Sequence, residues 1–365
     1  MTEFTVGVEE EFHLVNADTG ELHVRAGDVL ARLTGPLDDE VEPELLRSQI
    51  ETQTPVCSTL DEVRTELVRL RRDLAAAAGQ AGCRIAASGT WPADTPPVPP
   101  TEKCRYEEIA DRFGRTAREQ TTCGCHVHVH VDNPDLAVAV IRRSRQWLPA
   151  VLAVSANSPF WRGADTTYQS YRSQVWARWP SAGSPPALRS AAEYDELVAA
   201  LLATGVPRDE GMIYWDARKS RQFGTVEFRV ADVCLRVDHA LLLTALLRGL
   251  AQTAVAAEQA ARGYDDERGE LIRAAQWRAA RYGVEGELVD PTTGRPAPAG
   301  NVVRGLVDHV RPALEDHGDA EFVDDAVSRL LTAGAGARQQ RAVYRRAGHI
   351  DDVVRMIVDE TESPT

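Results

Sequence analysis

Two acidic side chains near the N-terminus are spaced to act together. The segment from Thr5 to Val15 alternates with a period of two, which predicts a β-strand. Glu9 and Glu11 then lie on one face of the strand, and Glu10 lies on the other. Two carboxylates so close repel each other unless solvent or a cation compensates, and Mg²⁺ and Mn²⁺ prefer oxygen ligands of this kind. The pair therefore indicates either a solvated edge strand or part of a metal site.

A second pair of acids lies in the segment ELLRSQIETQTPVC, residues 44–57. Glu44 and Glu51 are seven residues apart, so a helical segment would place both on one face. An extended strand would point them in opposite directions unless a bulge intervened. The segment therefore indicates either two surface acids or two further metal ligands.

Three histidines alternate in the segment CGCHVHVH, residues 123–130, which predicts another strand. His126, His128 and His130 share one face, and the two cysteines share the other. Thiols and imidazoles therefore cannot form one zinc site without a break at Gly124. Two readings stay open: zinc held by three imidazoles, or one imidazole that helps carboxylates hold a metal while its neighbours give polar support.

A fourth cluster combines an acid with an arginine on a predicted strand over 224–231. Glu227 and Arg229 share one face of this strand, and apolar residues occupy the other. The two side chains could form a plain salt bridge, or the acid could hold a cation while the arginine neutralises phosphate oxygens. Arg172, in the aromatic stretch 168–176, and the sequence WDAR at 215–218 add groups that suit a purine or a charged substrate.

The composition limits which partners such a site can have. The chain has 365 residues and a formal net charge of -14, which argues against a broad surface for nucleic acid or anionic membrane. A small anionic ligand remains compatible, because metal ions can lie between it and the acids. The sequence contains no GxxxxGK[ST] motif, no GxGxxG motif after a strand and no GxSxG motif. Six cysteines are too few for a disulfide framework and no secretory signal is evident, so we expect a cytoplasmic protein.

The elements that must position these residues predict an α+β fold with an antiparallel sheet. Strands concentrate before residue 235 and helices after it, and no linker is evident, so we expect one catalytic domain over 1–365, strand-rich in 1–235 and mainly helical in 236–365. Hydrophobic periodicity predicts helices over 61–78, 135–155 (with a kink at Pro149) and 191–203. We also expect a hairpin return at 21–24 and loops over 91–100 and 290–300.

Taken together, the motifs resemble those of a known enzyme family. They are GVEEEF at 7–12, IETQTPVC at 50–57, GCHVHV at 124–129, GTVEFRVAD at 224–232, LPAVLAVSANSPFWRGADT at 148–166, WDAR at 215–218 and ARYGVEG at 280–286. The chain resembles the ATP-dependent carboxylate–amine ligases of the short bacterial type 2 glutamate–cysteine ligase-like family, in the glutamine synthetase superfamily. The resemblance implies an antiparallel sheet that lines a funnel, is covered by helices, and holds ATP with two or three Mg²⁺ or Mn²⁺ ions.

By motif match, the resemblance also implies roles for individual residues. Arg229 would contact the transferred phosphate, and Arg172 would contact anions of the nucleotide or substrate. One ion would be held by Glu11, Glu44 and Glu51 and another by Glu9, His126 and Glu227, while His128, Trp215 and Arg218 would complete the nucleotide site. His130 departs from the family, which usually has a small residue at this position, and the departure bears on the substrate pocket more than on the metals.

The resulting hypothesis is a ligase that forms an amide through an acyl phosphate. Its substrates would be glutamate, through the γ-carboxylate, and an amine such as cysteine, without nucleic acid or membrane partners. Apolar faces on the C-terminal helices suit a homodimer. The alternatives are a zinc-dependent amidohydrolase that uses His126, His128 and His130, and a nucleotide-binding homologue without catalytic activity.

Overall fold

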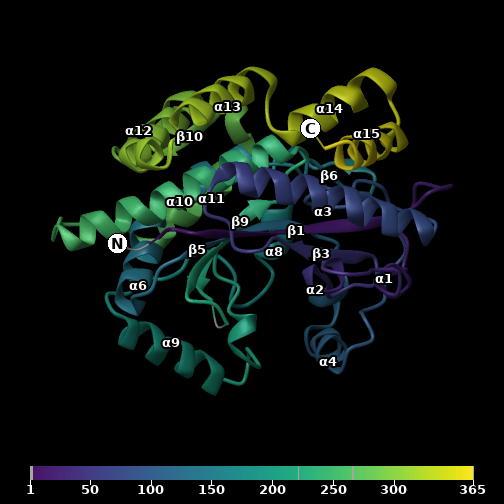
Figure 1. The fold of residues 1–365 in the computed structure, drawn as a ribbon, viewed down its shortest axis with the longest axis horizontal. Helices are drawn as coiled ribbons and strands as arrows, with labels where there is room; N and C mark the ends of the chain where they lie inside the picture. Colours follow the sequence, from purple (N-terminus) through teal and green to yellow (C-terminus); the bar gives the residue numbers. More distant parts are fainter. Residues whose placement is uncertain (1–2, 221, 265–266, 365) are drawn as a thin grey trace.

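The protein is built from one main β-sheet with helices packed around it (Figure 1). The computed structural model describes residues 3–220, 222–264 and 267–364. Its central sheet is antiparallel, with the order β2-β3-β1-β5-β9-β8 and with β4 also paired to β1. The sheet strands are β1 (Val6–Asn16), β2 (Val41–Pro43), β3 (Gln49–Gln53), β4 (Cys83–Ala86), β5 (Gly124–His130), β8 (Ala217–Lys219) and β9 (Thr225–Asp232). The fold is therefore α+β, as the order of elements in the sequence predicted.

Helices cover one face of the sheet, and both α3 (Leu60–Gln80) and α10 (Val237–Gln259) contact its strands (Figure 1). Helix α3 (Leu60–Gln80) begins at a capping box, in which Thr59 accepts a hydrogen bond from the backbone of Glu62 and Glu62 reciprocates. Its buried leucines recur at helical spacing, so one stripe packs on the sheet. The predicted helix over 61–78 is confirmed within two residues at each end.

The remaining helices lie around this centre. They are α1 (Ala26–Leu30), α2 (Leu37–Glu40), α4 (Cys104–Phe113), α5 (Arg115–Arg118), α6 (Pro134–Ser144), α7 (Leu148–Ser155), α8 (Arg172–Trp176), α9 (Ala191–Ala203), α10 (Val237–Gln259), α11 (Gly269–Tyr282), α12 (Ala299–His317), α13 (Ala320–Ala333), α14 (Gly336–Ala347) and α15 (Ile350–Glu362). Helices α4 and α9 project from the side of the sheet away from α3 and α10 (Figure 1). These two projections leave the middle of that sheet face open between them.

Helix α10 is apolar and long enough to cross a membrane, judged by length and composition alone. However, 78% of its most apolar window is buried inside the protein, where it contacts α12, α6 and α3. Most residues of the helix are buried, including the leucines from Leu241 to Leu243. This burial is that of a core helix.

Two sequence-based expectations were wrong, and a third is confirmed in a shorter form. The long helix expected over 135–155 is two helices, because the chain breaks at 145–147 and Pro149 lies in the first turn of α7, where a missing N–H costs nothing. The expected hairpin return at 21–24 is a short antiparallel pairing centred on the bridge between Val15 and Leu22. The loop expected near 290–300 contains the hairpin of β10 (Glu287–Asp290) and β11 (Arg295–Pro298) and then starts α12. A further small hairpin joins β6 (Phe160–Trp161) to β7 (Ala164–Asp165).

The two faces of β1 carry different acids, as the alternation predicted. Glu10 points to the helical layer and is fully buried. There Arg71 of α3 donates to its carboxylate at 2.8 Å through Nε and at 2.5 Å through Nη2. The same guanidinium donates to the carbonyl oxygens of Cys234 and Leu235 at 2.7 and 3.0 Å. Glu10 is thus a structural ion-pair residue, and Glu9 and Glu11 face the open side of the sheet.

Candidate active site

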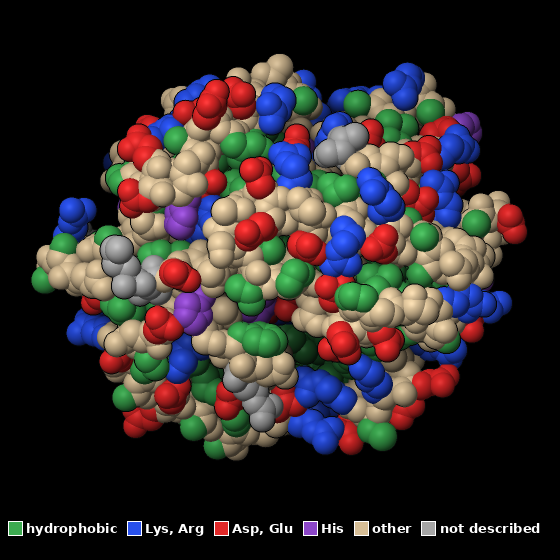
Figure 2. Space-filling model, in the orientation of Figure 1, with side chains coloured by type: hydrophobic (Ala, Val, Ile, Leu, Met, Phe, Trp, Pro, Cys, Tyr) green, Lys and Arg blue, Asp and Glu red, His purple; other side chains and the backbone are tan. Residues whose placement is uncertain are grey.

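A cavity of about 830 Å³ opens beneath the sheet, between α4 and α9. Figure 2 shows this side of the molecule hollowed between the two projections, with Lys and Arg side chains gathered at the lower rim. The strands of the sheet contribute many of the charged and imidazole side chains that line the cavity: Glu9, Glu42, Glu51, His126, His128, Arg218, Lys219, Glu227 and Arg229. The strand alternation that fills the opposite face with apolar side chains therefore collects the acids, imidazoles and arginines here.

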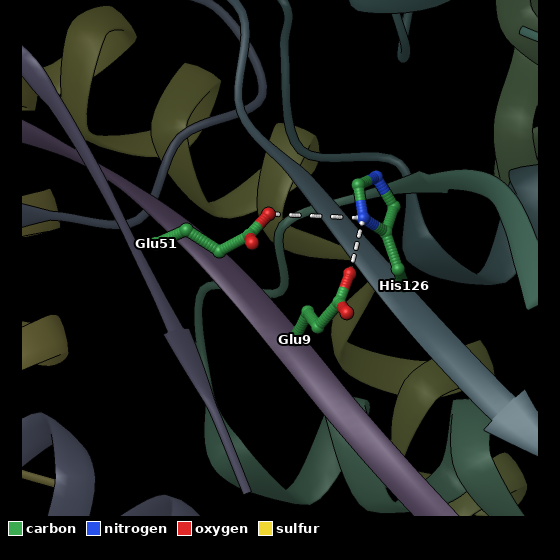
Figure 3. Close-up of side chains that lie close together, drawn as sticks. All are labelled: Glu9, Glu51 and His126. Carbon is green, nitrogen blue, oxygen red and sulfur yellow. Dashed lines mark hydrogen bonds and ion pairs between the residues drawn. The ribbon is translucent and has the colours of Figure 1, made fainter. Parts of the chain in front are cut away.

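Strand register brings Glu9, Glu51 and His126 together. Glu9 lies opposite His126 across the β1–β5 pair, and Glu11 lies opposite Glu51 across the β1–β3 pair. Nδ1 of His126 is 3.0 Å from Oε2 of Glu9 and 4.0 Å from Oε2 of Glu51 (Figure 3). Two carboxylates from neighbouring strands thus converge on one imidazole nitrogen, an arrangement that could hold a cation.

Three overlapping groups of side chains have metal-ligand geometry among the described residues. In each group the potential ligand atoms lie within 4.8 Å of one another. The groups are Glu11, Glu44 and Glu51; Glu9, Glu51 and His126; and Glu9, His128 and Glu227. The first is the set that the resemblance implied for one ion. The second implied set, Glu9, His126 and Glu227, is divided between the other two groups, which share Glu9.

The hairpin between β2 and β3 explains how Glu44 reaches Glu51. The chain leaves β2 at Pro43 and enters β3 at Gln49, so the turn folds Glu44 back beside the strand that carries Glu51. The Glu44 carboxylate also accepts a hydrogen bond at 2.9 Å from the backbone N–H of Leu45. The segment is therefore neither a helix nor a straight strand, the two conformations that the spacing of seven had left open.

Burial makes the first group costly to ionise without a cation. Burial and the neighbouring Glu44 raise the pKa of Glu11 to about 8. Burial, with repulsion from Glu9, Glu44 and Glu11, raises the pKa of Glu51 well above its ordinary value, and burial also raises that of Glu44. A divalent cation bound among the three carboxylates would offset their mutual repulsion and the free-energy cost of ionising them in a buried site. This set of oxygen donors therefore fits a hard metal ion.

The acids in the other part of the cluster, Glu9 and Glu227, are stabilised by hydrogen bonds from histidines and by neighbouring arginines. Burial opposes the ionisation of Glu9, but hydrogen bonds from His126 and His128 outweigh it and hold its pKa well below the ordinary value. Burial likewise opposes the ionisation of Glu227, and Arg229 and Arg218 outweigh it, so that pKa is lowered. Burial and the charge of Arg229 lower the pKa of His126 to about 4. His126 is therefore neutral near pH 7, the form in which imidazole binds metals.

The arginines occupy different depths of the site. Arg218 makes a two-point contact with Glu227, at 2.6 Å through Nε and 3.1 Å through Nη2. Arg229 pairs with the same carboxylate and lines the cavity. Arg172 is 2% exposed and lies behind the cavity against Gly124, where an added Cβ would be 2.9 Å from its Cζ. A side chain at this position of β5 would therefore displace the guanidinium from where it lies.

The structure separates His130 and Trp215 from the cluster. His130 pairs with Asp132 through Nε2 at 2.5 Å and lines a second cavity of about 620 Å³. No group of three imidazoles is among the potential metal groups of residues 3–220, 222–264 and 267–364. The ring of Trp215 packs in the main core against Tyr194, and neighbouring Tyr214 lines the large cavity in its place.

Sequence reasoning missed the charged residues at the rim of the cavity. Lys103 and Arg105, at the start of α4, and Lys219, at the end of β8, line this rim. Arg105 forms an ion pair with Asp209, and Lys219 forms one with Asp195 at 2.8 Å. No periodicity marks these residues, because they lie at element ends that are far apart in the sequence. The one available signal was their charge, next to the proline-rich loop over 91–100.

Comparison with known proteins places the chain in a family. Residues 5–360 match the model of glutamate–cysteine ligase family 2. A protein of Frankia alni, provisionally named glutamate–cysteine ligase 2-2, is 47% identical over 98% of this chain and 97% of its own length. A protein of Streptomyces avermitilis, provisionally named glutamate–cysteine ligase 2-1, is 45% identical over 98% of this chain and 99% of its own.

Solved structures share the fold at low sequence identity. The bifunctional glutathione synthetase of Pasteurella multocida superimposes with a TM-score of 0.71 and 15% identity, over 98% of this chain and 51% of that protein. The glutamate–cysteine ligase of Francisella tularensis, solved in complex with AMP, has a TM-score of 0.68 and 12% identity, over 100% and 90% of the two chains. The catalytic fold expected from the resemblance is thereby confirmed. The chain belongs to glutamate–cysteine ligase family 2 and is an ATP-dependent ligase that forms C–N bonds.

Proposed function

We propose that the protein joins the γ-carboxylate of glutamate to an amine such as cysteine, through an acyl phosphate and with the consumption of ATP. The observation that supports this proposal is the overlap of three acid and imidazole groups at the floor of a cavity that also contains Arg218 and Arg229. Divalent cations would be held at the floor, and anionic substrates would bind to these cations and to Arg229.

Two Mg²⁺ or Mn²⁺ ions would fit the floor of the cavity. Glu11, Glu44 and Glu51 would hold one, and their raised pKa values mark the site as one that favours added positive charge. A second would be held on the other side of Glu9, with His126 or His128 and Glu227. When bound, such ions stabilise the charge that develops on phosphoryl oxygens during transfer.

The second cavity suits the base of ATP. It shares Glu9, His128 and Phe223 with the large cavity, so a ligand could extend from one to the other past the metal site. Its walls include the exposed side chains of Val56 and Phe223, which are 77% and 52% accessible. A purine would bury this apolar surface and place its phosphates beside Glu9 and His128. The nucleotide set would then include His128 and Arg218, with Trp215 supporting Tyr194 from the core.

The arginines complete the proposed chemistry. Arg229, beside Glu227, would neutralise the phosphoryl group as the glutamate carboxylate attacks it. Arg172 would bind a substrate anion from behind Gly124. The amine would then attack the acyl phosphate, so that an amide forms and phosphate leaves. Closure of the cavity by substrates matters here, because water would hydrolyse the acyl phosphate.

The cellular setting follows from the same chemistry. ATP and free amino acids are abundant in the cytoplasm, and the cysteines among the described residues are free thiols, so we propose a cytoplasmic enzyme. Leu271, Trp277 and Tyr282 expose apolar surface on α11, with 55%, 45% and 37% of each residue accessible. We propose that this helix contributes to a homodimer, which light scattering of the purified protein would test.

A screen of ADP release with pairs of amino acids and amines tests the function, with product masses confirmed by mass spectrometry. Glu51→Gln and Glu227→Gln should abolish turnover, because each removes one metal-binding charge from the open side of the sheet. Glu196→Gln, on the exposed side of α9, is the matched control and should behave like the wild type. Near-normal ADP release by both site variants, or tightly bound zinc with ATP-independent amide cleavage, would contradict the proposal.

A further inference from the structure

Two arginines of the site face one aromatic ring. The Cζ atoms of Arg172 and Arg229 lie 5.4 and 5.8 Å from the ring centre of Trp176. Arg172 and Trp176 are four residues apart on α8, so they share one side of that helix, and Arg229 approaches from β9. The electron-rich face of an indole attracts a guanidinium. Trp176 therefore contacts both of the arginines that, in the proposed function, bind anionic groups of the substrates.

Both guanidinium groups keep a donor free. The Nε atoms of Arg172 and Arg229 are buried and have no hydrogen-bond partner among residues 3–220, 222–264 and 267–364. A buried N–H group without a partner costs free energy, so such groups in a native site call for a ligand. Two such donors on cationic groups beside one ring are suited to bind an oxyanion.

Trp176 is itself held by its neighbours. The ring of Tyr214 meets it edge-on, with the ring centres 5.0 Å apart. The start of α8 is anchored because the backbone N–H of Arg172 donates to Oγ of Ser158 at 3.0 Å. That hydroxyl donates in turn to the buried carboxylate of Asp232 at 2.6 Å. The ring is thus a fixed support, and the arginines would follow its position.

We propose that Trp176 is a positioning residue that holds Arg172 and Arg229 together against their mutual repulsion, so that both bind one oxyanion of the substrates. The inference rests on the proposed function, because it takes both arginines as parts of the anion site. It adds that their spacing is set by an aromatic face rather than by the acids alone. A carboxylate and a phosphoryl group share the required chemistry, and the experiment separates the two sources.

The test compares Trp176→Leu and Trp176→Met, which remove the ring, with Trp176→Phe, which keeps a ring face. Trp161→Leu is the matched control, because Trp161 also contacts an arginine, Arg162 at 5.6 Å, but outside the large cavity. Isothermal titration of the metal-free protein with inorganic pyrophosphate, and separately with glutamate, measures anion binding. Melting temperatures of all variants establish that they are folded.

We expect the leucine and methionine variants to bind at least one of the two anions roughly tenfold more weakly, with the phenylalanine variant close to the wild type. The anion whose affinity falls identifies the source, and the KM of that substrate should rise in turnover assays. Three outcomes would overturn the inference. The leucine and methionine variants could bind both anions as tightly as Trp161→Leu does, or the phenylalanine variant could lose as much anion affinity as the leucine variant. The third is a wild type that binds neither anion. Failure of the proposed function looks different: no pair of substrates would release ADP, while the binding contrast persists.

Discussion

Removal of one charge from the metal cluster should stabilise the metal-free protein. The perturbation is Glu11→Gln, which keeps the size of the side chain and an oxygen that can accept the 2.5 Å hydrogen bond from the backbone of Gly124. Burial and Glu44 raise the pKa of Glu11 from 4.5 to about 8 in the folded state. At about 1.36 kcal/mol for each tenfold change in proton affinity, ionisation of this carboxyl costs the folded state on the order of 5 kcal/mol.

The sign of the effect fixes its pH window. Below pH 4.5 the carboxyl is protonated in the folded and unfolded states alike, so the variant and the wild type should be equally stable. Between pH 4.5 and about 8 the unfolded chain loses this proton first, so the free energy of unfolding of the wild type falls as the pH rises. Glu11→Gln escapes this loss. At pH 8.5 it should melt roughly 5 °C higher, given the unfolding entropy of a chain of this length.

Thermal unfolding in EDTA measures the stability of the metal-free protein, and thermal unfolding with excess Mg²⁺ measures the stability of the metal-bound protein. The wild type should gain stability from Mg²⁺, most strongly above pH 8, and the variant should gain much less because it has lost a ligand. Glu196→Gln, which removes an exposed carboxylate from α9, should follow the wild type throughout. The reasoning fails if Glu11→Gln is no more stable than the wild type at pH 8.5 in EDTA, or if its advantage is the same at pH 5.

Three further predictions concern residues that support the site. Arg71→Met leaves the Glu10 carboxylate buried without its partner and should lower the free energy of unfolding, measured in urea, by about 3–5 kcal/mol. A decrease below about 1 kcal/mol would contradict the importance of this buried ion pair. Gly124→Ala places a methyl group against Arg172 and should reduce turnover at least about tenfold. The circular dichroism spectrum should be unchanged, and full activity would refute the proposed role of Arg172. Thr59→Ala removes the N-cap of α3 and should cost about 1 kcal/mol in the same urea assay, and an unchanged unfolding midpoint would argue against the cap.

Local alternation predicted the part of the site that lies within single strands. The period of two placed Glu9 and Glu11 on one face of the strand and Glu10 on the other, and the structure confirms this division. It likewise put His126 and His128 on one side of β5, and both lie beside Glu9. Such predictions succeed because side-chain direction in a strand depends only on the backbone of that strand.

Contacts between distant segments could not be predicted from periodicity. Glu44 joins the cluster through a turn that shows no periodicity, so only the motif resemblance grouped it with Glu11 and Glu51. Glu10 finds Arg71 on a helix 61 residues away, a pairing that requires the packing of α3 on the sheet. Trp176 meets Arg229 only after β9 has taken its place in the sheet. Each of these depends on tertiary packing, which a single sequence does not display.

The Glu10–Arg71 pair has a consequence for how the strand finds its register. Three consecutive glutamates could slide by one position on neighbouring strands with little change in composition. Such a slip would turn Glu9 and Glu11 into the helical layer, where one guanidinium could not neutralise both, and would bring Glu10 to the cavity. The native register is therefore the one in which the single buried guanidinium meets a single carboxylate. A residue that binds no ligand thus helps to decide which two carboxylates of β1 face the metal site.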